Sequence, residues 1–162
     1  IKEIWELGSI TSDINRNRKL RIGLNTNNTW NSIYGDLKDN GLMPYFDCVV
    51  CDEVLRHYNI DGNSVPLKKP SNFALNLALD LLDVETEKTI HIGDTFDDLR
   101  GSQNIMRRNS TTSQNMITVG ATYGFEGKER LEKGFKTPNG ILHFDYLIDS
   151  PGKLVEIVKK YL

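Results

Sequence analysis

Short apolar runs alternate along the chain with amphipathic stretches, a pattern typical of strands separated by helices. Apolar residues at the helical spacing i, i+3, i+4 and i+7 begin at Trp30, and a strongly periodic helix is predicted over 71–83. Residues 97–104 and the segment that begins at Ser150 also favour helices. The apolar runs predict strands over residues 19–25, 46–54, 88–94, 116–122 and 144–149. This alternation predicts an α/β fold with a mostly parallel sheet covered by helices on both faces.

Residues with capping preferences stand at the ends of these helices. Thr29 can cap the start of the first helix, and Gly41 can close its end. Ser71 is a candidate N-cap of the second helix. At the last helix Ser150 suits the N-cap and Pro151 the first helical position, where the N–H that proline lacks would have no helical partner.

The composition is that of an ordinary globular domain. The chain has 162 residues, of which 38% are hydrophobic, so it can bury one real core. Lys and Arg number 20 and Asp and Glu 22, a balance that gives no reason to expect nucleic acid or an acidic membrane as a partner. No apolar run approaches the ~18 residues of a membrane-spanning helix. We expect a cytoplasmic protein; because the chain opens with Ile1, an upstream targeting signal, for example a mitochondrial one, stays open.

The two cysteines, Cys48 and Cys51, lie within one predicted strand. Residues three apart on a strand point to opposite faces, so this pair can neither chelate a metal together nor form a local disulfide. We expect two reduced cysteines that serve only packing, which fits a reducing compartment.

Two polar segments, 56–67 and 105–115, interrupt the alternation. The second contains Ser, Thr, Asn and Arg with almost no apolar residues, and we interpret it as a mobile surface insertion. A regulatory phosphorylation site at Ser110, preceded by Arg107 and Arg108, is the alternative interpretation.

Candidate chemistry lies where the predicted strands end, because ligands of parallel α/β sheets bind beyond the carboxyl ends of the strands. The first such end is NTNN, residues 25–28, between a predicted strand and a predicted helix. A hydroxyl, amide side chains and backbone N–H groups at a helix N-terminus suit an anion. Simple capping of the helix is the alternative that these residues alone leave open.

The second candidate is the lysine of LKKPSN. Lys69 stands before Pro70, which favours an extended backbone for Lys69 just ahead of a helix. A lysine fixed there can stabilise negative charge as a compact cation. A solvated surface lysine is the alternative, and Lys68 is the more ordinary of the two.

The third candidate is KTIHIGDTFDDLRG, in which Asp94, Asp97 and Asp98 fall within five positions. At a helix N-terminus these acids would complement the helix dipole, and Thr95 could cap the helix. The alternative is a hard cation such as Mg²⁺, which prefers oxygen ligands and water. A calcium EF-hand is excluded, because Phe96 stands where the second ligand of that loop should be.

Taken in order along the chain, these stretches resemble the motifs of the haloacid dehalogenase-like hydrolase superfamily, in its phosphatase branch. RIGLNTNNTW resembles the second motif, LKKPSNFAL the third and HIGDTFDDLRGSQN the fourth, and VGATYGF and FDYLIDSPGKLVEIV resemble the tail of the same fold. The resemblance implies a Rossmann-like three-layer sandwich. Because it runs over nearly the whole chain, we expect 1–162 to be one partial core domain, with the segment 105–115 as its departure from the family pattern.

The resemblance also implies a role for each matching residue. Thr26, with the backbone at Asn27, would bind the substrate phosphate, and Lys69 would pair with that phosphate and with a nucleophilic carboxylate. Asp94 would ligate Mg²⁺ directly, and Asp98 would act through water or by orienting Lys69.

In this family an aspartate attacks phosphorus, and water then hydrolyses the aspartyl-phosphate. We therefore expect a Mg²⁺-dependent phosphomonoester hydrolase acting on a small phosphorylated metabolite or a phosphoprotein. A haloacid dehalogenase is the nearest enzymatic alternative, but that chemistry uses no metal and does not need Asp94 and Asp98. A binding or regulatory protein that keeps the fold without activity is the alternative from another class. Asp97 lies off the motif and is expected to be solvated.

The family's first motif, an apolar strand ending in Asp-x-Asp that supplies the nucleophile and the general acid, is not recognisable. The one aspartate among the 25 residues before Thr26 is Asp13, in a polar stretch with no strand before it. We expect a C-terminal portion of a longer enzyme whose nucleophile strand and cap lie upstream; a non-catalytic relative is the alternative. In the family that strand lies centrally, between the strands of the second and fourth motifs. We therefore expect residues 1–162 alone to be unstable and to lack phosphatase activity.

Overall fold

The computed structural model describes residues 1–10, 20–103, 105 and 116–162. The strands in these ranges are β1 (Gly23–Asn25), β2 (Cys48–Val50), β3 (Ile90–Gly93), β4 (Ile117–Ala121), β5 (Phe135–Thr137), β6 (Gly140–Leu142) and β7 (Tyr146–Ile148). The α-helices are α1 (Lys2–Ile10), α2 (Trp30–Asp39), α3 (Asp52–Arg56), α4 (Phe73–Leu82), α5 (Phe96–Ser102), α6 (Gly127–Lys133) and α7 (Gly152–Tyr161). Short 3-10 helices lie at η1 (Met43–Tyr45), η2 (Val65–Leu67) and η3 (Thr86–Lys88).

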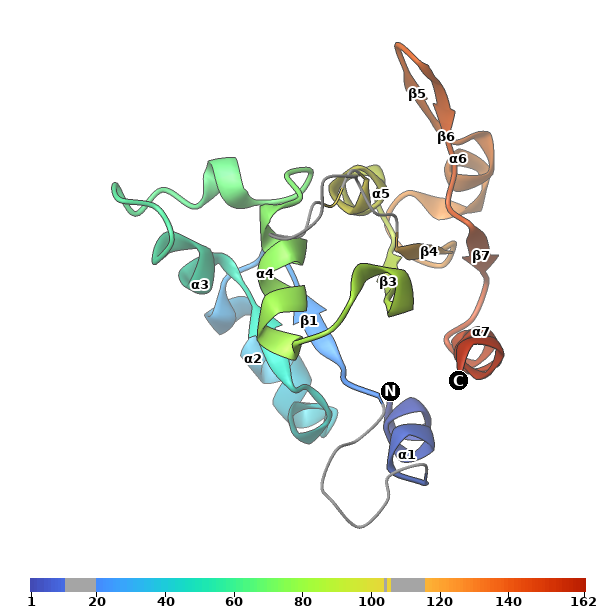
Figure 1. The fold of residues 1–162 in the computed structure, drawn as a ribbon, viewed down its shortest axis with the longest axis horizontal. Coiled ribbons are helices and arrows are strands. Elements are labelled where there is room, and N and C mark those ends of the chain that lie inside the picture. The colour runs from blue at the N-terminus through green and yellow to red at the C-terminus, as the bar shows by residue number, and fades with distance from the viewer. Residues whose placement is uncertain (11–19, 104, 106–115) are drawn as a thin grey trace.

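The described strands form two parallel sheets and an antiparallel hairpin (Figure 1). In the first sheet β1 pairs with β2, and Asn25 stands opposite Val50. In the second sheet β4 lies between β3 and β7, and Gly93 stands opposite Gly120. The hairpin joins β5 to β6. The predicted α/β fold with mostly parallel strands is confirmed.

No strand pairing joins β1 to β3 in the described part of the chain, so the sheet is divided between them (Figure 1). This division agrees with the expectation that a strand lies between the second-motif and fourth-motif strands in the complete fold. That strand is not among the described residues. Asp13, the one aspartate ahead of β1, lies outside them.

The strands are shorter than the apolar runs indicate. The predicted strand 46–54 is wrong beyond Val50, because Cys51 ends the extended run and Asp52 begins helix α3. Acidic side chains at Asp52 and Glu53 favour this helix, since they complement the dipole at its first turn.

The predicted ends of α2 are confirmed. The side chain of Thr29 accepts a hydrogen bond from the Ser32 N–H at 3.3 Å, which is the expected N-cap. At the other end Gly41 follows the C-cap Asn40 with a φ of +63°, a left-handed conformation that glycine adopts without steric cost. Local sequence therefore sets both limits of this helix.

Two other predicted caps are displaced by one residue. The N-cap of α4 is Asn72, while Ser71 accepts the Phe73 N–H at 3.2 Å from outside the helix. The N-cap of α7 is Pro151 rather than Ser150. Single-residue shifts of this kind are common, because the first turn of a helix has no intrahelical N–H partners to fix its limit.

The sequence pattern did not indicate α1, α6 or the β5–β6 hairpin. Helix α6 buries only Leu131, so it has no apolar stripe from which a helix could be predicted. Each hairpin strand has three residues, too few to show a clear alternation of apolar and polar positions.

Helix α4 is the centre of the core and packs against β1, β2 and α5. Its buried residues are Ala74, Leu75, Leu77, Ala78, Leu79 and Leu82. Val50 and Leu55 pack on one part of this face, and Ile105 and Met116 on another.

Ile105 is fully buried, so the predicted surface insertion 105–115 is wrong at its first residue. Residues 106–115, with Ser110, lie outside the described residues, and their interpretation stays a prediction.

Both cysteines are free, as predicted. The pKa of the Cys48 thiol is raised to about 11, mainly by burial and to a smaller extent by the negative charge of Asp47. This thiol is therefore protonated at neutral pH. Cys51 is buried and precedes α3. The two residues serve packing.

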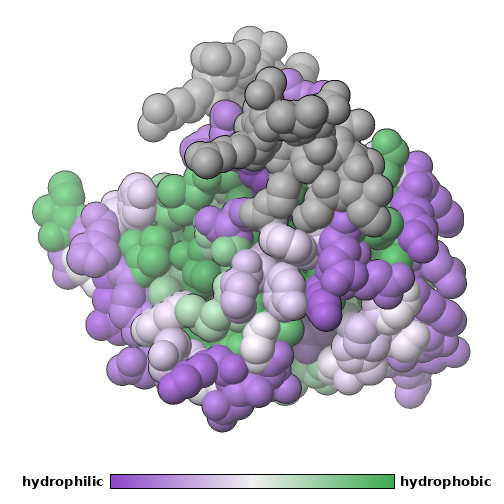
Figure 2. Space-filling model, turned by 90° about the horizontal axis from the view of Figure 1, so that it is seen from below, coloured by the Kyte–Doolittle hydropathy of each residue, from purple (hydrophilic) through white to green (hydrophobic). Residues whose placement is uncertain are grey.

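The face seen in Figure 2 is mostly hydrophilic, with an area of apolar side chains in its left half. Large apolar side chains that are exposed include Ile60, Val65 and Phe125, which lie in loops or at their edges. Across the described ranges, no helix has the length and apolar character needed to cross a membrane.

Candidate active site

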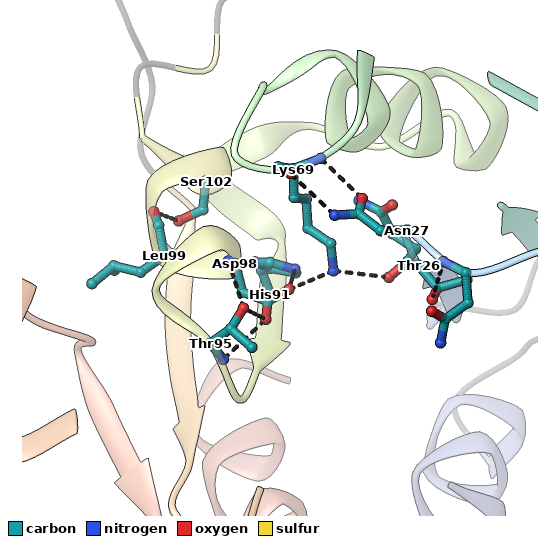
Figure 3. A network of polar contacts seen from close by, with 10 residues as sticks. Thr26, Asn27, Lys69, His91, Thr95, Asp98, Leu99 and Ser102 are labelled. Carbon is teal, nitrogen blue, oxygen red and sulfur yellow. Dashed lines mark hydrogen bonds and ion pairs between the residues drawn. The ribbon is translucent and has the colours of Figure 1, made fainter. Parts of the chain in front are cut away.

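The ammonium group of Lys69 lies between the carboxyl end of β1 and helix α5, which follows β3 (Figure 3). Lys69 Nζ lies 2.5 Å from Asp98 Oδ1 and donates to the Asn25 carbonyl at 3.2 Å. The Lys69 side chain is only 12% exposed, so the interpretation as a solvated surface lysine is wrong. One cation therefore connects β1 with α5, the helix that follows β3.

The position of the Asn25 carbonyl shows on which side of β1 this cation lies. Thr26 N–H donates to the Val50 carbonyl at 2.9 Å, toward β2. In an extended strand the carbonyl of the preceding residue, here Asn25, points to the side opposite to this N–H group. Lys69 Nζ consequently lies at the edge of β1 that faces away from β2, between that strand and Asp98.

The Asn27 side chain fixes the backbone of Lys69. Asn27 Oδ1 accepts the Lys69 N–H at 3.0 Å, and Asn27 Nδ2 donates to the Lys69 carbonyl at 3.1 Å. The Lys69–Pro70 peptide bond is cis. Because these two bonds hold the Asn27 amide against Lys69, we expect the phosphate contact that the sequence predicts to come from the backbone at Asn27.

Thr26 stands beside this cluster and does not cap α2, since Thr29 does. Thr26 Oγ1 accepts the Asn28 N–H at 3.1 Å. A hydroxyl that accepts one hydrogen bond keeps its own hydrogen for donation. Thr26 can therefore donate to an anion while it remains part of the turn after β1.

Asp98 is 4% exposed, and both of its carboxylate oxygens are engaged. Oδ1 faces Lys69, and Oδ2 accepts from the N–H and the hydroxyl of Thr95 at 3.1 and 2.7 Å. Thr95 Oγ1 in turn accepts the Asp98 N–H, so the two residues form a capping box at the start of α5. The predicted helix-cap arrangement is confirmed. Burial raises the pKa of the Asp98 carboxyl, but Lys69, His91 and Thr95 outweigh it and lower the pKa below its ordinary value.

Gly93 allows Asp98 to approach β3. A Cβ on residue 93 would lie 2.1 Å from Asp98 Cβ and 2.2 Å from its carboxyl carbon. The glycine of the Gly-Asp pair in the fourth motif is therefore explained by packing, because a side chain at position 93 would collide with Asp98.

His91 is part of the site and was not predicted from the sequence. It is 9% exposed, and its Nε2 lies 3.9 Å from Asp98 Oδ1. Burial lowers the pKa of His91 to about 4; Asp98 opposes this effect and Lys69 adds to it, so the imidazole is neutral at pH 7. A signal was present in the sequence: His91 stands two residues before Gly93 and so lies on the same face of β3.

Asp94 is hydrogen-bonded by residues outside the Lys69 cluster, and Asp97 lies outside the site. Asp94 Oδ2 accepts the Phe125 N–H at 2.8 Å, whereas Asp94 Oδ1 accepts no hydrogen bond from a described residue. The Asp97 side chain is 51% exposed and lies 3.6 Å from Arg100, which confirms that it is solvated.

Asp94 supplies part, but not all, of the oxygen ligands that a hard cation needs. Across the described residues, no group of three or more His, Cys, Asp and Glu side chains could hold a metal ion. Asp94 Oδ1 is a carboxylate oxygen left for a ligand, while Asp98 is used by Lys69 and Thr95. Mg²⁺ commonly uses one or two carboxylates and fills its remaining positions with water and phosphate oxygens. Asp94 is compatible with that role.

Lys68 is also less exposed than the sequence suggests, because it pairs with a buried acid. Asp52, 1% exposed, faces Lys68 Nζ at 2.5 Å and Arg56 at 2.6 Å, and it accepts from the Ser64 hydroxyl. Hydrogen bonds from Lys68 and then Ser64 lower the pKa of Asp52 to about 2. This cluster anchors the loop that leads into Lys69.

We expect Asp52→Asn to destabilise the protein at neutral pH and to have a much smaller effect near pH 2. The folded-state pKa of Asp52 lies near 2, below the ~3.9 of an unfolded chain. The ionised carboxylate therefore stabilises the fold above about pH 4, and this contribution is lost as the pH falls toward 2. Denaturation midpoints of the wild type and the variant between pH 7 and pH 2.5 measure it. Asp39→Asn, at an exposed position in α2, is the control. A difference between wild type and variant that does not shrink from pH 7 to pH 2.5 would contradict the assignment.

Comparisons with known proteins show the family and the fold of the chain. The family model for haloacid dehalogenase-like hydrolases matches residues 10–108. The pyrophosphatase PpaX of Bacillus mycoides is 27% identical over 140 residues, which are 86% of this chain and 53% of that protein. A predicted phosphatase from Clostridium acetobutylicum has a TM-score of 0.65 at 19% identity, over 99% of this chain and 58% of that one. The hydrolase YfnB from Bacillus subtilis, solved bound to magnesium, has a TM-score of 0.57 at 18% identity, over 97% and 53%. The chain thus spans little more than half the length of these relatives.

Proposed function

Because this chain belongs to the haloacid dehalogenase-like hydrolase family, we propose that the complete protein is a Mg²⁺-dependent phosphatase of small phosphorylated substrates. The observation that carries the proposal is the position of Lys69 Nζ, 2.5 Å from Asp98 and 3.2 Å from the Asn25 carbonyl. A largely buried cation fixed by two elements, beside the Thr26 hydroxyl, suits an anionic phosphoryl group.

Lys69 and Thr26 would bind the phosphoryl oxygens and offset the charge that develops on them. Asp98 would position Lys69, and Asn27 would hold the backbone of Lys69 in place. The nucleophile would be an aspartate outside the described residues. Its oxygen would bond to phosphorus as the alcohol leaves, and water would then cleave the acyl phosphate and restore the carboxylate.

Asp94 would hold Mg²⁺ through Oδ1. When bound, the ion would supply positive charge next to the phosphoryl group that is transferred. The relative named as a pyrophosphatase and the neighbour solved with magnesium support this part of the proposal. The relative named as a pyrophosphatase also favours a small phosphorylated compound over a phosphoprotein.

A chelator tests the proposed reaction. The complete protein should release phosphate from p-nitrophenyl phosphate or pyrophosphate with Mg²⁺, and EDTA should lower the rate by about 100-fold or more. Added Mg²⁺ should restore the rate, since the ion and not the fold is removed. Release of chloride from 2-chloropropionate, insensitive to EDTA, would instead show a dehalogenase. Release of neither product would favour the non-catalytic alternative.

A further inference from the structure

Asp94, which follows β3, is held by a turn that follows a different strand. Phe125 N–H donates to Asp94 Oδ2 at 2.8 Å, and Glu126 N–H donates to the Asp94 carbonyl at 3.2 Å. Two consecutive N–H groups thus bind the side chain and the backbone of one residue. This arrangement engages one carboxylate oxygen and leaves the other, Oδ1, without a hydrogen bond from the described residues.

Gly124 makes this close approach possible. A Cβ on residue 124 would lie 2.2 Å from Asp94 Cβ and 2.4 Å from Asp94 Oδ2, far inside van der Waals contact. The requirement is for space, because Gly124 is not among the glycines with positive φ. Asp94 cannot move away easily, since its side chain is short and hydrogen bonds hold both its carboxylate and its carbonyl.

The turn is itself fixed to the neighbouring strand. The N–H and the hydroxyl of Thr122 both donate to the Ile148 carbonyl, at 2.9 and 3.0 Å. Gly124 N–H donates to the Ala121 carbonyl at 3.1 Å, which closes the turn directly after β4. The position of Asp94 is therefore tied to β4 and β7 as well as to β3.

We infer that the turn 122–126 positions Asp94 to offer a single oxygen to Mg²⁺, and that Gly124 is the residue on which this geometry depends. The inference rests on the proposed function, which makes Asp94 the metal ligand. Mg²⁺ demands near-ideal octahedral geometry at short distances, so a ligand displaced by even part of an ångström binds it poorly. Groups that orient a ligand commonly contribute 10- to 100-fold to metal affinity.

Metal binding to the complete protein tests the inference without reference to activity. Mg²⁺ affinity is measured by calorimetry on metal-free protein, with Mn²⁺ binding followed by electron paramagnetic resonance. Gly124→Ala should weaken binding by about 10-fold or more. Gly152→Ala, at the start of α7 with nothing within 4 Å of the added carbon, is the matched control and should stay within about twofold.

Two further variants make every outcome decisive. If Asp94→Asn leaves Mg²⁺ affinity unchanged, the metal assignment of the proposed function fails, and the inference with it. If Asp94→Asn loses affinity while folded Gly124→Ala keeps it, the positioning role alone is overturned. Should Gly124→Ala not fold, Thr122→Val decides, because it removes only the hydroxyl bond to Ile148. Unchanged affinity in a folded Thr122→Val would then overturn the inference, and weakened affinity would support it.

Discussion

Replacing Lys69 by methionine should lower kcat/KM for phosphate release by about 10³-fold, a loss of about 4 kcal/mol of transition-state stabilisation. Methionine keeps much of the length of the side chain and removes its charge. The loss should be large because Lys69 is 12% exposed and positioned by Asn25, Asn27 and Asp98, so solvent cannot replace it. Steady-state kinetics on the complete protein measure the effect.

Two controls separate chemistry from folding in this experiment. Lys88→Met removes an exposed lysine that lies just before the start of β3, with its Nζ 3.2 Å from the Glu85 carboxylate. This variant should leave kcat/KM unchanged. The thermal midpoint of Lys69→Met shows how far the protein is destabilised when the buried Asp98 carboxylate loses its cation. A folded Lys69→Met with wild-type kcat/KM would contradict the assignment of Lys69.

The fold was largely predictable because apolar periodicity reports burial, and burial fixes the parallel strands and the long helices. The helix over 71–83 is an example: its residues on α4 are buried at the spacing that the sequence shows. The end of the strand 46–54 was not predictable in this way, since the acid that begins α3 is buried through its partners Lys68 and Ser64. That pairing joins residues distant in sequence.

The sequence indicated which strand ends carry the candidate site, but it did not indicate which side chains contact one another there. Thr26, Lys69 and Asp98 could be selected because each follows or precedes the correct element. The clamp of Asn27 on the Lys69 backbone joins residues 42 positions apart and has no sequence signal. The turn that holds Asp94 through Phe125 is likewise a tertiary contact. The roles of these residues stay proposals.

Asp94→Asn should lower Mg²⁺-dependent phosphate release by about 10³-fold. The amide keeps the shape of the side chain but removes the negative charge that a hard cation prefers. Asp97→Asn is the matched control three residues along the chain, because the Asp97 side chain is half exposed and pairs only loosely with Arg100, at 3.6 Å. It should retain wild-type activity.

One measurement decides whether this chain supplies the metal-binding and phosphate-binding part of a phosphatase site. Phosphate release by the complete protein is followed as Mg²⁺ is raised, in the wild type, Asp94→Asn and Asp97→Asn. We expect saturable activation of the wild type and of Asp97→Asn, and a rate for Asp94→Asn that stays about 10³-fold lower at every Mg²⁺ concentration. The same Mg²⁺ dependence in Asp94→Asn as in the wild type would contradict it.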